Sequence, residues 1–344
     1  MMLREVHRLP LLLIALFALA TGVGCRARGE TRRAHEIQSS GECPGLTGQR
    51  LGQLSSERID EASGLVVSRR YGVLWTHNDS GDRARLFAID QRGRLLATYN
   101  LLKASHWDFE DIALLPTAQG DQLLVADIGD NFNFRPAVTI YRIDEPHPPS
   151  QPDASAVVRQ LAVKETITLS YAEGPRDAEA VFVVPRSKRQ PTDRLVIITK
   201  RPDGFEVYSG PLQSGTLKRI AKVSDRQIAR ISGADLSADR RLIVLRNPSA
   251  AFLYRWAENL PLERVFASRP CRLTLLREPQ GEAIAFGPQS QTIYSLSEGY
   301  NQPLYRYTLG QPTAAQRGLS NGAPLRRKTS ALHRSKTSRQ KTSN

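Results

Sequence analysis

Short apolar runs bounded by turn residues recur along this chain, and a carboxylate stands directly before five of them. The clearest case follows Glu110, where apolar residues 112–115 and 123–126 are separated by Pro116, Gly120 and Asp121. Two such runs joined by a tight loop are typical of buried antiparallel strands. The other acids in the same position before an apolar run are Glu61, Glu179, Asp235 and Glu282.

The five acids are 49, 69, 56 and 47 residues apart, and a loose period of this size indicates a repeat architecture. Each repeat also contains a second apolar run, at 72–76, 123–127, 195–200, 242–246 and 292–297. Third strands, in which apolar and polar residues alternate, are expected at 84–90, 138–143, 205–209, 251–256 and 303–309. Fourth strands are expected at 95–101, 163–169, 217–223 and 272–276.

The last repeat lacks a fourth strand after it, and residues 50–54, which precede the first acid, can supply one. Such closure hides a sheet edge that would otherwise be exposed. The sequence therefore predicts an all-β fold. We expect a single β-propeller of five blades, with six as the alternative, closed by an N-terminal strand over residues 46–310.

The two ends of the chain differ from this body. Arg4 and Arg8 precede the apolar run 11–20, so residues 1–24 are expected to be a secretory signal peptide. Cys25 follows Gly24 and resembles a lipoprotein cleavage site, although Gly22 stands where such sites usually carry a branched aliphatic residue. We expect lipidation of Cys25, with an ordinary cysteine as the alternative. Residues 25–45 would then form a polar tether, and residues 311–344 a disordered basic tail.

Two cysteines remain, Cys43 and Cys271. In an oxidising compartment they are candidates for a disulfide that joins the chain start to the last repeats. Two free buried cysteines are the alternative, because the sequence cannot show that they are close.

The net charge of +14 is concentrated at the ends. Residues 1–35 carry +4 and residues 311–344 carry +8, so the body carries only about +2. Together with the predicted export, this distribution argues against a nucleic-acid partner.

In a propeller the first strand of each blade lines the central channel, so the five acids Glu61, Glu110, Glu179, Asp235 and Glu282 would form a ring. Their mutual repulsion could be relieved by a cation, and oxygen ligands of this kind suit Ca²⁺. The alternatives are that each acid accepts backbone hydrogen bonds from the neighbouring blade, or that the acids are catalytic.

A second polar set follows the second strands at similar distances, and it should gather at one mouth of the channel. His77 is a candidate acid or base, and Lys200 and Arg246 are candidate anion ligands. The full set of candidates is His77, Asn78, Asp79, Asp127, Asp130, Lys200, Arg246 and Glu298. Turn formation is the alternative role for its Asp and Asn residues. The set contains no Ser-His-Asp triad, nucleotide-binding loop or zinc-ligand spacing.

Six segments resemble the repeat motifs of secreted bacterial propellers akin to the phytase-like and SdiA-regulated families. They are WTHNDSGD (75–82), WDFEDIA (107–113), DIGDN (127–131), DAEAV (177–181), SGADLS (232–237) and GEAIA (281–285). The resemblance implies a propeller fold, Ca²⁺ binding by the repeated acids and phosphoester hydrolysis. No complete phosphatase site is recognisable in these segments.

We therefore expect an exported protein, either a membrane-anchored lipoprotein or periplasmic or extracellular. Its function would be to bind an unidentified ligand or envelope protein, with Ca²⁺ as the candidate cofactor. A calcium-dependent phosphoester or ester hydrolase that acts at the channel mouth is the alternative, and a purely structural envelope protein is a third possibility.

Overall fold

The computed structural model describes residues 43–151, 158–188, 190–257 and 260–310. The expected signal peptide, the lipidation site, most of the tether and the basic tail lie outside these residues. Among the described residues, no helix is both long enough and apolar enough to cross a membrane.

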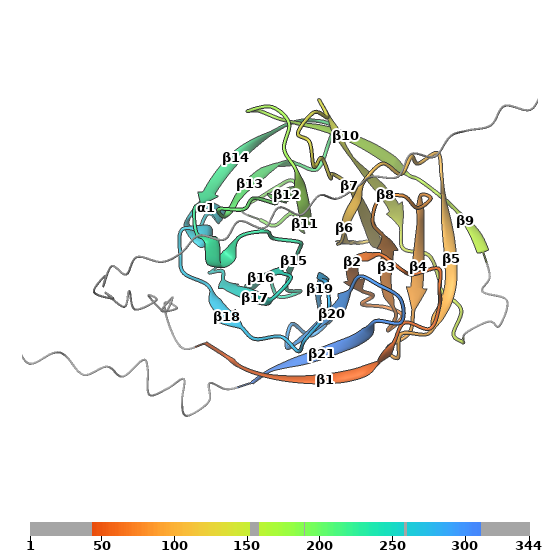
Figure 1. Cartoon of the computed structure of the whole chain (residues 1–344). Coiled ribbons are helices and arrows are strands. Elements are labelled where there is room, and N and C mark those ends of the chain that lie inside the picture. The colour runs from red at the N-terminus through yellow and green to blue at the C-terminus, as the bar shows by residue number, and fades with distance from the viewer. Residues whose placement is uncertain (1–42, 152–157, 189, 258–259, 311–344) are drawn as a thin grey trace, which may run out of the picture. The chain divides into compact units, whose positions relative to one another are not determined.

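The described strands form units of four that are arranged around a common centre (Figure 1). The innermost strands are β2 (Ala62–Val67), β6 (Phe109–Thr117), β11 (Ala178–Val184), β15 (Gly233–Leu236) and β19 (Gly281–Phe286). They lie side by side in a closed ring, in which β19 also packs against β2. The predicted all-β propeller is confirmed by this arrangement.

Three further strands follow outward from each innermost strand, and each is antiparallel to the one before it. The first unit adds β3 (Leu74–Asn78), β4 (Arg85–Ile89) and β5 (Leu95–Leu102). The second adds β7 (Gly120–Asp127), β8 (Val138–Asp144) and β10 (Glu165–Tyr171), and the third adds β12 (Arg194–Thr199), β13 (Phe205–Pro211) and β14 (Gly215–Val223). The fourth adds β16 (Leu242–Asn247), β17 (Ala250–Arg255) and β18 (Cys271–Leu273), and the last adds β20 (Thr292–Ser297) and β21 (Pro303–Gly310).

The ring is closed by the N-terminal strand β1 (Gly45–Gln53), which pairs antiparallel with β21. Residues 46–49 lie opposite residues 306–309, and a bulge follows Arg50. The closing strand predicted at 50–54 therefore exists and is longer than the sequence indicated. Cys43, just before β1, is joined to Cys271 of β18 by a disulfide with a Cα–Cα distance of 5.4 Å. This bond ties the start of the fold to the neighbouring unit.

Three elements were not anticipated. Strand β9 (Val158–Ala162) adds to the outer edge of β5 in parallel, and its residues are mostly exposed, so it lacks the alternating pattern that identifies a half-buried strand. The others are the short helix α1 (Leu262–Phe266) and the 3₁₀ turn at Arg226–Ile228.

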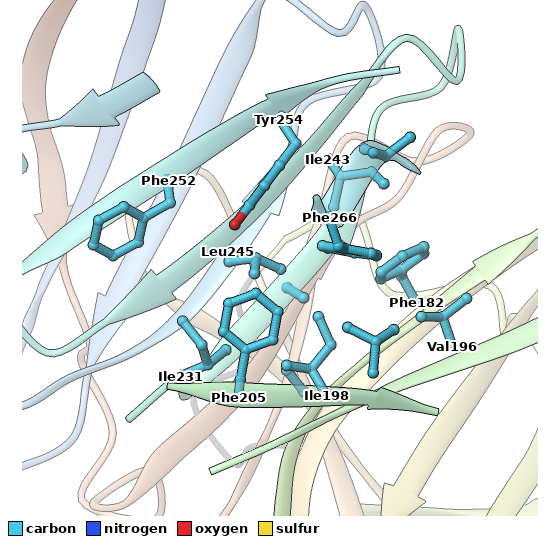
Figure 2. Close-up of a cluster of buried hydrophobic side chains, with 14 of the residues drawn as sticks. Phe182, Val196, Ile198, Phe205, Ile231, Ile243, Leu245, Phe252, Tyr254 and Phe266 are labelled. Carbon is cyan, nitrogen blue, oxygen red and sulfur yellow. The ribbon is translucent and has the colours of Figure 1, made fainter. Parts of the chain in front are cut away.

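Apolar side chains fill the spaces between neighbouring units, as Figure 2 shows for the third and fourth. Phe182, Ile198 and Phe205 of one unit meet Leu245 and Phe252 of the next. Phe266 of α1 lies among them, with its ring centre 6.0 Å from that of Phe205. Burying one side chain of this size contributes roughly 1.5–3 kcal/mol. Inter-unit packing of this kind holds the innermost strands, and the polar groups at their ends, at fixed positions around the centre.

Candidate functional site

Glu110, Glu179 and Glu282 occupy matching positions in three innermost strands. In each strand the pairing register slips by one residue at the glutamate, so that the glutamate is the extra residue of a β-bulge. A bulge re-aims its side chain out of the regular alternation. Burial raises the pKa of all three carboxylates, and the charge of Lys200 opposes this rise in each of them, so the three lie around a common cation.

The predicted ring of five acids is therefore only partly observed. Glu61 is exposed and lies two residues before Ser63, whose hydroxyl donates to the backbone carbonyl of Glu110 at 2.7 Å. Asp235 turns toward the next unit, where its carboxylate accepts a hydrogen bond from the Phe286 amide at 2.7 Å. Asp235 thus links two units through the backbone, which was the alternative role considered for all five acids.

The densest group of carboxylates is Asp79, Asp108 and Glu110. Each offers one oxygen, and these three oxygens lie within 4.8 Å of one another. Asp79 follows β3, while Asp108 directly precedes β6, so the group spans the first two units. Gly129, just after β7, lies against Glu110 and Asp108 so closely that a Cβ atom at this position would collide with both carboxylates. We call Asp79, Asp108 and Glu110 the carboxylate cluster.

Glu110 is the most deeply buried member of the cluster, with 3 % of its surface exposed. Burial, and then the charges of Glu179, Asp79 and Asp108, raise its pKa well above the ordinary value. Burial and the charge of Asp79 likewise raise the pKa of Asp108 to about 6. Negative charges outnumber positive charges at the cluster, and a bound cation or protons would reduce the repulsion among the acids.

Lys200, whose charge acts on Glu110 and Asp79, already forms an ion pair. Its Nζ donates to Glu179 Oε1 at 2.7 Å, so it neutralises the carboxylate beside the cluster. The sequence had suggested that Lys200 holds an anion, but in the structure its ammonium group is paired with Glu179.

Arg246 also differs from the expected anion ligand. Its side chain is 0 % exposed, lies 2.8 Å from a Glu278 carboxylate oxygen and donates to the Ala283 carbonyl at 3.1 Å. The guanidinium packs against Gly281, where a Cβ atom would collide with it. Arg246 is thus a structural link between the last two units.

His77 is fully buried, and its Nδ1 lies 2.9 Å from the Asn78 carbonyl oxygen. Burial lowers its pKa to about 4, so the imidazole is neutral at physiological pH. Its other nitrogen, Nε2, is enclosed against Gly64, where a Cβ atom would collide with it. Asn78 donates to the Arg58 carbonyl and to Asp60 and Asp82, which is a turn-stabilising role. An enclosed, neutral His77 does not offer the accessible acid or base that the sequence suggested.

Asp127 and Asp130 hold the loops next to the carboxylate cluster in place, but they are not part of the cluster. Asp127 forms a buried ion pair with Arg135 at 2.8 Å and accepts the backbone amides of Trp107 and Asp108. Asp130 accepts the amides of Phe134 and Arg135, which fixes the loop after β7. Both aspartates therefore stabilise loops, which was the alternative role considered for the Asp and Asn residues of this set.

Glu298 directly follows β20 in the last unit, where the charges of Glu282, Asp79 and Glu61 act on it. Burial and the charge of Glu282 raise its pKa to about 7. It adds to the negative charge of the mouth.

Asp108 was missed by the sequence reasoning, although it was detectable. It lies two residues before Glu110 in the WDFEDIA segment, a spacing that can bring two side chains to the same side of an extended chain. Ser63 and Ser232 were missed because they are not acidic. The Ser232 hydroxyl lies 3.3 Å from the carbonyl oxygens of Gly281 and Glu282, which repeats the link made by Ser63.

The strand pairing and these contacts define a β-propeller with a carboxylate-rich mouth, a fold that suits a binding module in general. No family model matches the chain, and no curated protein matches it either. Among solved structures, the Dos1 propeller is similar, at 13 % identity and a TM-score of 0.36, over 74 % of this chain and 59 % of that chain. This chain thus spans less than two thirds of that structure, and the fold assignment depends on the strand pairing itself.

Proposed function

We propose that this chain is an exported, membrane-anchored β-propeller that binds a ligand or an envelope partner at the carboxylate-rich mouth. In this proposal the carboxylate cluster holds a calcium ion. The observation that carries it is the carboxylate cluster, in which the buried Glu110 lies beside two further acids and one oxygen of each lies within 4.8 Å of the others. The motif segments that resemble phytase-like and SdiA-regulated propellers support the same class of protein.

The donor set fits calcium better than the other common ions. All three side chains offer hard carboxylate oxygens, and Ca²⁺ accepts six to eight oxygens in irregular geometry. Mg²⁺ demands a near-ideal octahedron, while zinc sites usually include nitrogen or sulfur ligands. Asp79, Asp108 and Glu110 would supply part of the shell, and a bound ion would supply positive charge that the cluster lacks.

The ion site is tested by thermal unfolding with calcium and with chelator. A ligand that binds only the folded state at a hundredfold excess over its dissociation constant stabilises that state by about 2.7 kcal/mol. We expect calcium to raise the melting temperature of the wild type. Glu110→Gln should abolish most of this rise without lowering the melting temperature in chelator, because it removes a charge that repels its neighbours.

Glu61→Gln is the matched control, since Glu61 is an exposed acid outside the carboxylate cluster. It should leave the calcium response intact. A wild-type melting temperature that is the same in calcium and in chelator would refute the ion site.

The membrane anchor is tested at Cys25. Mass spectrometry of the mature protein should find an acylated cysteine at its N-terminus, and Cys25→Ala should move the protein from the membrane fraction to the soluble fraction. One buried acyl chain binds a bilayer only marginally, whereas two chains anchor it stably. A mature N-terminus at another residue without acyl groups would refute the anchor.

We do not propose a hydrolase. Its anion ligands would be Lys200 and Arg246, and both are committed to ion pairs, with Glu179 and Glu278.

A further inference from the structure

Three aromatic side chains beside the carboxylate cluster are exposed to an unusual degree. Trp107 is 60 % exposed, Phe132 is 83 % exposed and Phe134 is 55 % exposed. They come from two loops of the second unit, before β6 and after β7, and Trp107 directly precedes Asp108 of the cluster. The Trp107 and Phe134 rings lie 6.0 Å apart, and Phe132 belongs to the same loop as Phe134. Exposed large apolar residues grouped in this way mark interaction sites, whereas scattered ones need no explanation.

Hydrogen bonds hold this aromatic surface in place. Asp130 accepts the amides of Phe134 at 3.0 Å and of Arg135 at 2.9 Å, and its own amide donates to Asp177 of the third unit at 3.0 Å. Asn133 accepts the Asp177 amide at 3.0 Å. The loop that carries Phe132 and Phe134 is thus bonded to two units, and such preorganisation lowers the entropic cost of binding.

The orientation of Trp107 is fixed in the same way. Its backbone amide donates to Asp127, and the Arg135 guanidinium lies 5.2 Å from the centre of its ring. The Phe134 ring lies 6.0 Å from the same indole, tilted by 54°. Arg135 in turn forms the buried ion pair with Asp127. The indole is thus supported by a charged pair and by a second ring while more than half of its surface stays exposed.

We propose that Trp107, Phe132 and Phe134 form a stacking platform for a saccharide, with the neighbouring acids as hydrogen-bond acceptors for its hydroxyls. Aromatic faces carry partial negative charge, and the C–H groups on one side of a pyranose ring are weakly positive. Hydroxyl donors form short, strong bonds to carboxylates. An apolar platform next to carboxylates matches a ring that has one C–H face and a rim of hydroxyls.

Charge argues against the two other occupants of such a surface. An organic cation would share Trp107 with Arg135, which already makes the cation–π contact with this indole. An anionic bilayer surface would bring its head groups against Asp79, Asp108 and Glu110, which are acidic and surrounded by further acids. An uncharged saccharide neither competes with Arg135 for a cation–π contact nor is repelled by the acids.

This inference rests on the proposed binding role of the mouth and names its ligand class, but it does not require bound calcium. The test uses isothermal calorimetry and affinity electrophoresis on the full chain. The probes are β-1,4-linked oligosaccharides of glucose and of N-acetylglucosamine, tetramethylammonium, and vesicles of mixed neutral and anionic lipid. Every probe is measured both in calcium and in chelator, and the vesicle arm uses the variant Cys25→Ala so that an acyl chain cannot contribute.

We expect binding of at least one oligosaccharide. Trp107→Ala should weaken it about tenfold or more, which corresponds to about 1.4 kcal/mol. Trp107→Phe should restore part of the affinity, because it keeps an aromatic face. Leu276→Ala is the matched control, since Leu276 is exposed on a different unit and should have no effect. Equal melting temperatures of the variants would show that the loss is not due to unfolding.

The inference is overturned if the wild type binds no oligosaccharide, or if Trp107→Ala binds as tightly as the wild type. Binding of tetramethylammonium alone, or of vesicles alone, would also overturn it. If the protein binds an oligosaccharide in chelator while its melting temperature does not respond to calcium, this result would refute the calcium site and support the saccharide platform. A melting temperature that responds to calcium, without saccharide binding that depends on Trp107, would support the calcium site and refute the platform.

Discussion

Gly129 shows how a single residue controls the geometry of the carboxylate cluster. Its backbone passes Glu110 and Asp108 so closely that there is no room for a side chain, while the Gly129 amide donates to the Asp108 carbonyl at 3.2 Å. Its φ angle is not in the left-handed region. Glycine is therefore required here for space and not for backbone conformation.

Gly129→Ala should push both carboxylates out of place. Overpacking of this kind costs roughly 1–3 kcal/mol, which chemical denaturation in chelator would measure. The calcium-induced rise in melting temperature should also shrink, because two of the three proposed ligands move. Gly310→Ala is the control, since a Cβ atom there meets nothing within 4 Å. Wild-type stability together with a wild-type calcium response would contradict this account of Gly129.

At the scale of strands, Asp111 links innermost strands that belong to different units. Its carboxylate accepts the amides of Ile112 on β6 at 2.8 Å and of Val181 on β11 at 2.9 Å, and it lies 3.4 Å from the Ala234 amide on β15. Asp111 thus has the inter-unit role that was considered for the predicted ring acids, although it was not one of them.

Asp111→Ala should destabilise the fold whether or not calcium is present. It leaves buried amides without an acceptor, and each unsatisfied group costs about 1–3 kcal/mol. Asp111→Asn is the matched variant, because it keeps one acceptor oxygen and should lose less stability. Urea denaturation of both variants, with and without calcium, tests this expectation. Equal losses for Ala and Asn would show that the hydrogen bonds are not the cause.

At the scale of the whole fold, stability depends on how the ring is closed. Strand β1 pairs with β21 along most of its length, and the Cys43–Cys271 disulfide then fastens it to the neighbouring unit. The two cysteines are 228 residues apart, so the bond closes a loop that contains most of the residues of the fold. In the unfolded chain this loop has fewer conformations than an open chain.

Removing the disulfide should cost about 2–5 kcal/mol, because cross-linking such a long loop lowers the entropy of the unfolded chain. Denaturant titration of the double variant Cys43→Ser, Cys271→Ser measures the loss. Cys25→Ser is the control, since Cys25 lies outside the bonded pair. A double variant as stable as the wild type, or free thiols at both positions in the purified protein, would rule out this contribution.

The sequence by itself determined the fold class. Short apolar runs, turn residues and the repeated acid were enough to predict an all-β propeller closed by an N-terminal strand, because alternation and chain punctuation are local properties. The same patterns predicted that acids such as Glu110 and Glu179 lie at the start of innermost strands. Strand β9 escaped because its exposed residues carry no such pattern.

Only the tertiary structure decided which polar groups meet. The register slips at Glu110, Glu179 and Glu282 turn these side chains to one side, while Asp235 turns to the Phe286 amide of the next unit. A shift of one residue reverses the face of a strand, and spacing along the chain does not reveal it. Likewise, the burial and pairing of Arg246 and Lys200 depend on residues far away in the sequence, so their availability to a ligand could be read only from the folded chain.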